Sequence, residues 1–367
     1  MAFGVGSFHF AWRTVEGATT AQDYVAALTR ALNDIPTIKN VEIAHEEIDP
    51  DCGFEPDVPD WGEGEGAYPW IDFFQLKFEV FIPKRLQDEL LPRPRAATGT
   101  ERFAVHQTFG FESPVTFVRP LAPTGDHDPS TSVMLVREYL RREFKDPRHG
   151  IAFQCLGPSP LHAEFLLADK AQGLSPEHPF IGSVKPTDEF DRVEIWYDPG
   201  VYGRVEEALD DLFFELTPQL SVCYAIYAGE ARALFAWAAL SEQVDALVNR
   251  GAVTRRQRAW RALSRGRALS RLHQTLAEFE ASAVDAANFI ERSRKEFARA
   301  KPLIPLREII DVAVDDCERF PVPQIEKLVN HIEARRFHQL DLLAALVAAI
   351  VGGIVGSVIT AVLTKSN

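Results

Sequence analysis

The chain is poor in the residues and motifs that usually identify a chemistry. Only four of its 367 residues are cysteines and only two are methionines. Four scattered cysteines form neither a disulfide framework nor paired zinc ligands. The sequence also lacks a Gly-Lys-Ser/Thr phosphate loop, G-x-G-x-x-G, G-x-S-x-G and H-E-x-x-H. These absences exclude the common signatures of nucleotide-dependent enzymes, serine hydrolases and zinc proteases, and we expect no cofactor and no metal ion.

Basic side chains are scarce in the first two thirds of the chain. Residues 1–249 contain 20 Lys or Arg and 40 Asp or Glu, a balance of −20, whereas residues 250–367 contain 19 and 13, a balance of +6. An acidic N-terminal part repels the phosphate backbone of nucleic acids, so we expect no nucleic acid to bind there. The uneven charge predicts separate roles for the two parts.

Residues 1–215 alternate between strand-like and helix-like patterns, which predicts an acidic α+β head domain with a mixed or antiparallel sheet. The helix-like segments are 21–33, 130–144 and 205–216. The strand-like segments are 5–14, 40–47, 70–82, 102–111, 115–119, 151–156, 162–167 and 192–197. Segments 102–119 and 151–167 have the spacing of antiparallel hairpins. The opening order of strand, helix, strand and strand is compatible with a ferredoxin-like or duplicated arrangement.

Residues 216–340 are expected to form a helical neck. Apolar residues spaced alternately by three and four run from Leu269 to Phe297, which is a heptad pattern. Two interpretations of this seam stay open: a coiled coil between subunits, or packing within a helical bundle of one chain.

The neck also contains a basic patch, with no acidic residue between Asp245 and Glu278. Its arginines are Arg250, Arg255, Arg256, Arg258, Arg261, Arg265, Arg267 and Arg271. The alternatives for this patch are a solvated helix face, contact with anionic lipid headgroups, docking on the acidic head, and binding of a nucleotide or nucleic acid.

The C-terminal segment is the most apolar part of the chain. Leu342 to Leu363 is 22 residues without a charge, and such a helix is about 33 Å long, which is enough to cross a bilayer. We therefore expect a transmembrane helix over 341–364 with a short tail at 365–367. Because the N-terminus has no secretory pattern, we expect a tail-anchored protein in the cytoplasmic (inner) membrane, with its N-terminal region in the cytoplasm. Small residues recur every four positions in this segment, which predicts self-association of the span: Ala344, Ala348, Gly352, Gly356 and Thr360.

The head offers only weak candidates for catalysis. Cys155 and His162 flank a turn and would face each other in the predicted hairpin, as a nucleophile and its base. His106 and Thr108 lie two residues apart on a strand-like segment and so share one face, as in the H-x-T motifs of phosphoesterases. Packing within a sheet is the favoured explanation of these residues.

These features predict a membrane protein whose head senses or binds a ligand or protein partner and controls self-association of the span, such as a membrane-disrupting effector of a defence or stress response. The expected partners are membrane lipid and further copies of the chain. One alternative is a membrane-tethered enzyme with a hydrolase-like site in the head. Another is a membrane scaffold that recruits a protein through its acidic loop, residues 42–65, or through the basic patch.

Overall fold

The computed structural model describes residues 1–12, 21–45, 54–55, 68–69, 74–91, 99–109, 113–124, 128–155, 161, 163–169, 174, 179–185, 191–248, 255–299 and 320–334. The chain divides into two compact units. The first, here called the α+β unit, comprises Met1–Leu234 and Val284–Cys317. The second, the helical unit, comprises Phe235–Ala283 and Glu318–Asn367.

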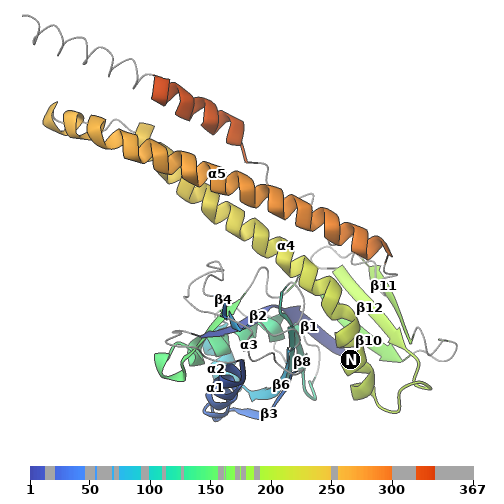
Figure 1. Ribbon diagram of the computed structural model, residues 1–367. Helices are drawn as coiled ribbons and strands as arrows, with labels where there is room; N and C mark the ends of the chain where they lie inside the picture. Colours follow the sequence, from blue (N-terminus) through green and yellow to red (C-terminus); the bar gives the residue numbers. More distant parts are fainter. Residues whose placement is uncertain are drawn as a thin grey trace, which may run out of the picture. The chain divides into compact units, whose positions relative to one another are not determined.

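The α+β unit is built around a mixed sheet of eight strands in the order β11-β12-β10-β1-β8-β7-β6-β3 (Figure 1). Neighbouring strands are antiparallel except β10 and β12, which are parallel. The strands are β1 (Ala2–Gly6), β3 (Ile38–His45), β6 (Phe74–Phe81), β7 (Arg102–Phe109), β8 (Val115–Pro120), β10 (Ala163–Asp169), β11 (Phe180–Lys185) and β12 (Asp191–Tyr197). Two small sheets pair β2 (Phe8–Trp12) with β9 (Ile151–Cys155) and β4 (Phe54–Glu55) with β5 (Tyr68–Pro69).

The helices include α1 (Ala21–Asn33), α2 (Lys84–Leu90), α3 (Pro129–Glu143), α4 (Val205–Val248) and α5 (Arg255–Arg299), with a 3-10 turn at Pro147–His149 and a further helix over residues 322–334. The start of α3 illustrates how local sequence fixes an end. Asp128 accepts hydrogen bonds from the backbone N–H groups of Ser130 and Thr131, and proline follows it at the first helical position. This is the preferred chemistry of a helix N-terminus.

The alternating side chains of the large sheet contribute to two separate cores. On one face, Phe103 and Val105 of β7 pack with Leu28 of α1 and Val136 of α3. The opposite face is apolar near β1, β8 and β10, and residues of α4 cover it, among them Ala208, Leu209, Leu212, Phe213 and Leu216. Because α4 packs only part of this face with apolar residues, the remaining part, on β6 and β7, is free to carry polar side chains.

The helical unit has its own core, formed by α4, α5 and the helix over 322–334. Leu240 and Val244 of α4 pack with Leu269, Leu272 and Leu276 of α5, and Val329 completes the cluster. The heptad seam of α5 is therefore buried within one chain over these residues. This outcome favours bundle packing over a coiled coil between subunits.

The ferredoxin-like outline and one predicted hairpin were wrong. β1 pairs with β8 and β10 rather than with the β3–β6 hairpin. β9 pairs with β2, whereas β10 pairs with β1 and β12, so residues 151–167 form no hairpin. The predicted hairpin of β7 and β8 is confirmed. Local patterns identify strands, but long-range register decides which strands pair.

The membrane part of the prediction was also wrong. Within the part of the chain that the structure describes, no helix is long and apolar enough to cross a membrane. The long helices α4 and α5 carry charged residues along their lengths, and they bury apolar side chains within the protein. Leu342 to Leu363, whose hydropathy alone suggested a span, lies outside the described residues. The transmembrane helix and the single-pass inner-membrane location are therefore not retained.

Candidate functional site

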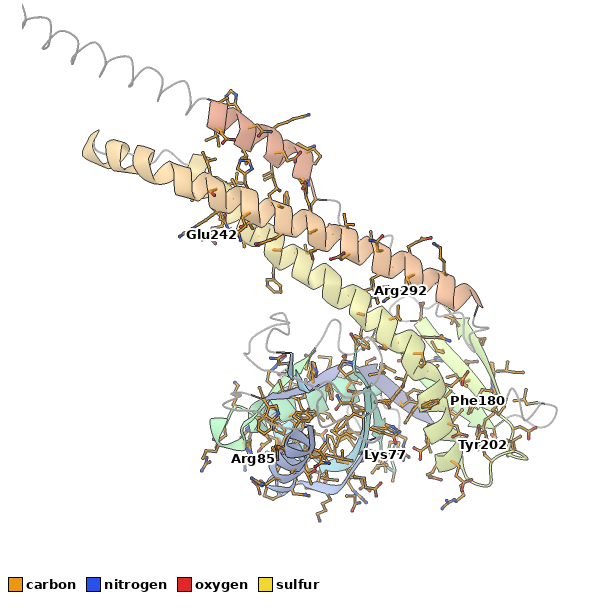
Figure 2. The ribbon with its side chains drawn as sticks, viewed as in Figure 1. Lys77, Arg85, Phe180, Tyr202, Glu242 and Arg292 are labelled. Atoms are coloured by element: carbon orange, nitrogen blue, oxygen red, sulfur yellow. The ribbon has the colours of Figure 1, made fainter. Side chains whose placement is uncertain are left out.

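A group of charged side chains gathers on the α4 side of the sheet, around the small residue Ala104 of β7. Register places Ala104 between Glu79 of β6 and Arg119 of β8, and it places His106 beside Lys77 of β6. We call this group the charged patch; its members are Lys77, Glu79, Arg102, His106, Arg119, Glu206 and Asp210. Figure 2 shows Lys77 on the sheet of the α+β unit. The alternation of β6 and β7 explains why these side chains share one face.

Two ion pairs tie the charged patch together. The Lys77 ammonium lies 2.9 Å from the carboxylate of Asp210, which links β6 to α4. Arg102 of β7 donates to Glu79 of β6 at 2.5 Å. Hydrogen bonding from Arg102 holds the pKa of Glu79 below its ordinary value. Both acids therefore stay ionised at neutral pH, and the charged patch has both signs of charge.

His106 is buried at the inner edge of the charged patch. Its ring lies 5.2 Å from that of Phe213, edge to face, and burial lowers its pKa. The side chain of Gln75 lies 2.7 Å from Nε2, and Asp210 lies 3.6 Å from Nδ1. In the neutral ring, this arrangement places the proton on Nδ1, towards Asp210, and Nε2 accepts from the Gln75 amide. His106, followed by Lys77, lowers the pKa of Asp210 to about 2.

Arg119 differs from the other cations of the charged patch. It is half-buried, and burial lowers its pKa although Glu206, Glu79 and Asp210 oppose this effect. Its one polar contact among the described residues is to the sulfur of Met1 at 3.6 Å. A thioether is a weak acceptor, whereas a guanidinium has five N–H donors. The charged patch therefore holds a guanidinium with donors to spare.

The predicted pair of Cys155 and His162 receives no support. Cys155 lies on β9 opposite Phe8, and burial raises the pKa of its thiol to about 12. A thiol with that pKa is protonated at neutral pH and is a poor nucleophile. His162 lies outside the described residues, and the hairpin that would have aligned it with Cys155 does not form.

The two residues of the H-x-T prediction lie on one strand, β7. His106 and Thr108 both project from β7 towards α4, and Thr108 is fully buried. The Thr108 hydroxyl has no hydrogen-bond partner among the described residues. The second His-Gln-Thr of the chain, at 273–275, lies on α5 in the helical unit, where His273 pairs with Glu333. The second motif therefore lies on a helix rather than on a strand, and in the other unit.

The other predicted site residues are only partly described. Ala344, Ala348, Gly352, Gly356 and Thr360 lie outside the described residues. Seven arginines of the basic patch, other than Arg250, lie on α5, and Arg271 is exposed there. The side chains of the other six lie outside the described part of the chain: Arg255, Arg256, Arg258, Arg261, Arg265 and Arg267.

Sequence reasoning missed the charged patch apart from His106. A signal for two of its seven members is present, because β6 reads FQLKFEVF and places Lys77 and Glu79, together with Gln75, on one face of a strand. Arg119 and Asp210 had no such signal, since they come from elements far apart in the sequence. Only the packing of α4 on the sheet brings these two residues to the same face.

The remaining tests add no assignment. Among the described residues, no group of three or more His, Cys, Asp or Glu side chains is placed to hold a metal ion. Comparisons with protein families, with characterised proteins and with solved structures find no match. Functional inference therefore depends on the geometry of the charged patch itself.

Proposed function

We propose that the α+β unit is a recognition domain rather than an enzyme, and that it binds the anionic group of a ligand at the charged patch. The observation that carries this proposal is Arg119, a half-buried guanidinium whose one polar contact among the described residues is a thioether. Charge-assisted hydrogen bonds from arginine to a carboxylate or phosphate are strong and geometrically specific. An incoming anion would thus supply the acceptors that Met1 does not.

The neighbours of Arg119 support a small ligand of mixed charge. Lys77 is paired with Asp210 and Arg102 with Glu79, and neither carboxylate forms an ion pair with Arg119 among the described residues. Glu206, which acts on Arg119 electrostatically, is exposed and makes no ion pair among the described residues. A ligand that carries an anionic and a cationic group could use Arg119 and Glu206 together.

The titratable groups favour binding over catalysis. A general base needs a nitrogen that has no hydrogen-bond donor on it and a pKa near neutral. In His106, Nε2 is hydrogen-bonded to Gln75, and burial lowers the pKa of the ring. The Cys155 thiol is protonated. Neither group is prepared for the hydrolase-like chemistry considered from the sequence.

Thermal unfolding of the full chain with added inorganic phosphate tests the proposal. Ligand at about ten times its Kd stabilises the folded state by about 1.4 kcal/mol. We expect phosphate to raise the Tm of the unmodified chain and to raise that of Arg119→Met by much less. Methionine keeps an unbranched apolar stem like that of arginine but donates no hydrogen bond.

The matched control is Arg192→Met. Arg192 also projects from a strand of the large sheet, but it pairs with Glu164 on the surface. Phosphate stabilises most folded proteins slightly because it is excluded from their surface, and this general effect should be the same in both variants. Equal stabilisation of the unmodified chain and Arg119→Met by phosphate contradicts the proposal.

A further inference from the structure

An exposed aromatic side chain, Phe81, lies on the same face of the sheet as the charged patch. Because side chains alternate along β6, Phe81 shares the face of Lys77 and Glu79. It is the last residue of β6, and it pairs in register with Arg102 of β7. Although it belongs to a central strand, Phe81 leaves 41% of its surface exposed. The charged patch therefore has an aromatic boundary at this end.

Contacts among its neighbours fix the surroundings of Phe81. Glu79 accepts hydrogen bonds from Arg102 at 2.5 Å and from the side-chain amide of Asn40 at 3.1 Å. Asn40 lies within the irregular part of β3 and has a positive φ of 54°, which asparagine tolerates better than most residues. An irregularity of this kind re-aims a side chain. Arg102, which faces Phe81 across the two strands, is therefore held by Glu79, and the exposed ring stays available to a ligand.

A small residue lies between Phe81 and Arg119 on this face. Ala104 of β7 is flanked in register by Glu79 and Arg119, and its methyl side chain is only partly buried. Strands lie about 4.8 Å apart and alternate residues about 7 Å apart, so the Cα atoms of Phe81 and Arg119 are about 12 Å from each other. One small ligand can therefore contact both side chains.

The charges around Arg119 favour a ligand with both signs of charge on adjacent groups. The guanidinium of Arg119 is an acceptor's partner with donors to spare, and the exposed carboxylate of Glu206 acts on it electrostatically. An α-amino acid carries a carboxylate and an ammonium on one carbon atom, which matches a guanidinium near a carboxylate. A ligand with only negative charge would be repelled by Glu206.

We propose that the ligand of the charged patch is a free aromatic amino acid, with its carboxylate on Arg119, its ammonium on Glu206 and its ring on Phe81. This inference rests on the proposed function, since it requires an anionic group to bind Arg119. Two aromatic rings attract each other beyond the apolar area that they bury. The charges therefore orient the ligand, and Phe81 selects amino acids that carry a ring.

Calorimetric titration of the full chain with L-phenylalanine and with L-alanine tests the role of the ring. The two ligands have the same carboxylate and ammonium groups. We expect phenylalanine to bind roughly ten- to a hundredfold more tightly, because its ring is partly buried and pairs with that of Phe81. Phe81→Leu should weaken phenylalanine binding by roughly two- to tenfold and leave alanine binding unchanged. The matched control, Phe235→Leu, replaces an exposed phenylalanine of the helical unit and should change neither affinity.

A ligand that lacks the ammonium tests the role of Glu206. 3-Phenylpropanoate has the ring and the carboxylate of phenylalanine but no ammonium. We expect it to bind the unmodified chain up to about fivefold more weakly than phenylalanine does, as for one exposed ion pair. The two ligands should bind Glu206→Gln with equal affinity, because the carboxylate that pairs with the ammonium is gone.

The failure of this inference can be told apart from the failure of the proposed function. Suppose that phosphate stabilises the chain through Arg119, but the chain binds phenylalanine no more tightly than alanine, or binds neither amino acid. The proposed function then stands and this inference is overturned. Phenylalanine binding that Phe81→Leu does not weaken also overturns this inference alone. Phenylalanine binding that is unchanged in Arg119→Met overturns the proposed function, and this inference with it.

Discussion

Asp210 is the residue through which α4 meets the polar part of the sheet. Its carboxylate lies 2.9 Å from Lys77 of β6 and 3.6 Å from His106 of β7. Its side chain is 54% exposed, so solvent screens part of the attraction. One carboxylate thus connects β6 and β7 to α4. The free-energy cost of its desolvation is small because the side chain stays largely exposed.

Asp210→Asn should destabilise the α+β unit by about 1 kcal/mol at neutral pH, since it removes the charge that pairs with Lys77. His106, and then Lys77, holds the pKa of Asp210 at about 2, below its ordinary value of 3.8. A carboxyl group whose pKa is lowered by folding stabilises the folded state at every pH above its ordinary pKa. This stabilisation is lost as the pH falls from 3.8 towards 2. Urea unfolding at pH 7 and at pH 3 should therefore show that the difference in unfolding free energy between Asp210→Asn and the unmodified chain is smaller at pH 3.

Glu164→Gln serves as the control for that measurement. Glu164 pairs with Arg192 of the neighbouring strand. We expect a loss of about 0.5 kcal/mol or less at pH 7. If Asp210→Asn and Glu164→Gln behave alike at both pH values, Asp210 has no special role in joining α4 to the sheet.

At the scale of single residues, the sequence predicts which side chain belongs to the site but not which side chains contact it. His106 was recognised because histidine and threonine two apart on a strand share a face. Its actual neighbours, Gln75, Asp210 and Phe213, come from β6 and α4. No local pattern gives these contacts, because they depend on how α4 crosses the sheet.

At the scale of elements, β1 and α3 approach each other unusually closely at Gly4. A Cβ atom at this position would lie 2.5 Å from the carbonyl oxygen of Pro129 and 2.5 Å from a methyl group of Val133. Real Cβ atoms do not come this near to other heavy atoms. Glycine is therefore required here for helix-on-sheet packing, while its backbone conformation is ordinary.

Gly4→Ala should destabilise the chain by about 1–3 kcal/mol because it overpacks the junction of β1 and α3. Adding Val133→Ala removes one of the two clashes, so the double variant should lose less stability than the sum of the single variants. Gly229→Ala is the control: it lies in α4 with open space around the added Cβ, and it should stabilise by up to about 1 kcal/mol. Chemical denaturation of the unmodified chain, the two single variants, the double variant and Gly229→Ala measures these differences. A neutral Gly4→Ala refutes the close approach.

Elements are what the sequence predicts best. The helix-like segment 21–33 coincides with α1, and the strand-like segments identify β3, β6, β7, β8, β9, β10 and β12 within a few residues. The hydrophobic pattern did not identify elements whose apolar residues show no strand or helix periodicity. β11 has Gly182 and Ser183 at its centre, and α2 has no buried residue, so neither shows a clear apolar face.

At the scale of the whole molecule, the chain builds separate cores for its two units. Leu212 of α4 is fully buried among residues of the α+β unit, whereas Leu272 of α5 is fully buried among residues of the helical unit. The sequence predicted a head followed by a neck, with a break near position 215. It did not predict that α4 would continue through Pro218 to Val248 and supply residues to both units, because which core each turn of the helix joins depends on tertiary packing.

Because the two units have separate cores, we expect each unit to unfold locally without the other. Leu212→Ala and Leu272→Ala delete the same atoms from fully buried sites, and each should cost about 2–5 kcal/mol. If each core stabilises its own unit, Leu272→Ala should accelerate amide hydrogen exchange at residues 240–244 and 269–276 and leave β7 and β8 protected. Leu212→Ala should do the reverse. Exchange that accelerates equally in both units for either variant would contradict separate opening, because it would mean that the chain opens as one cooperative body.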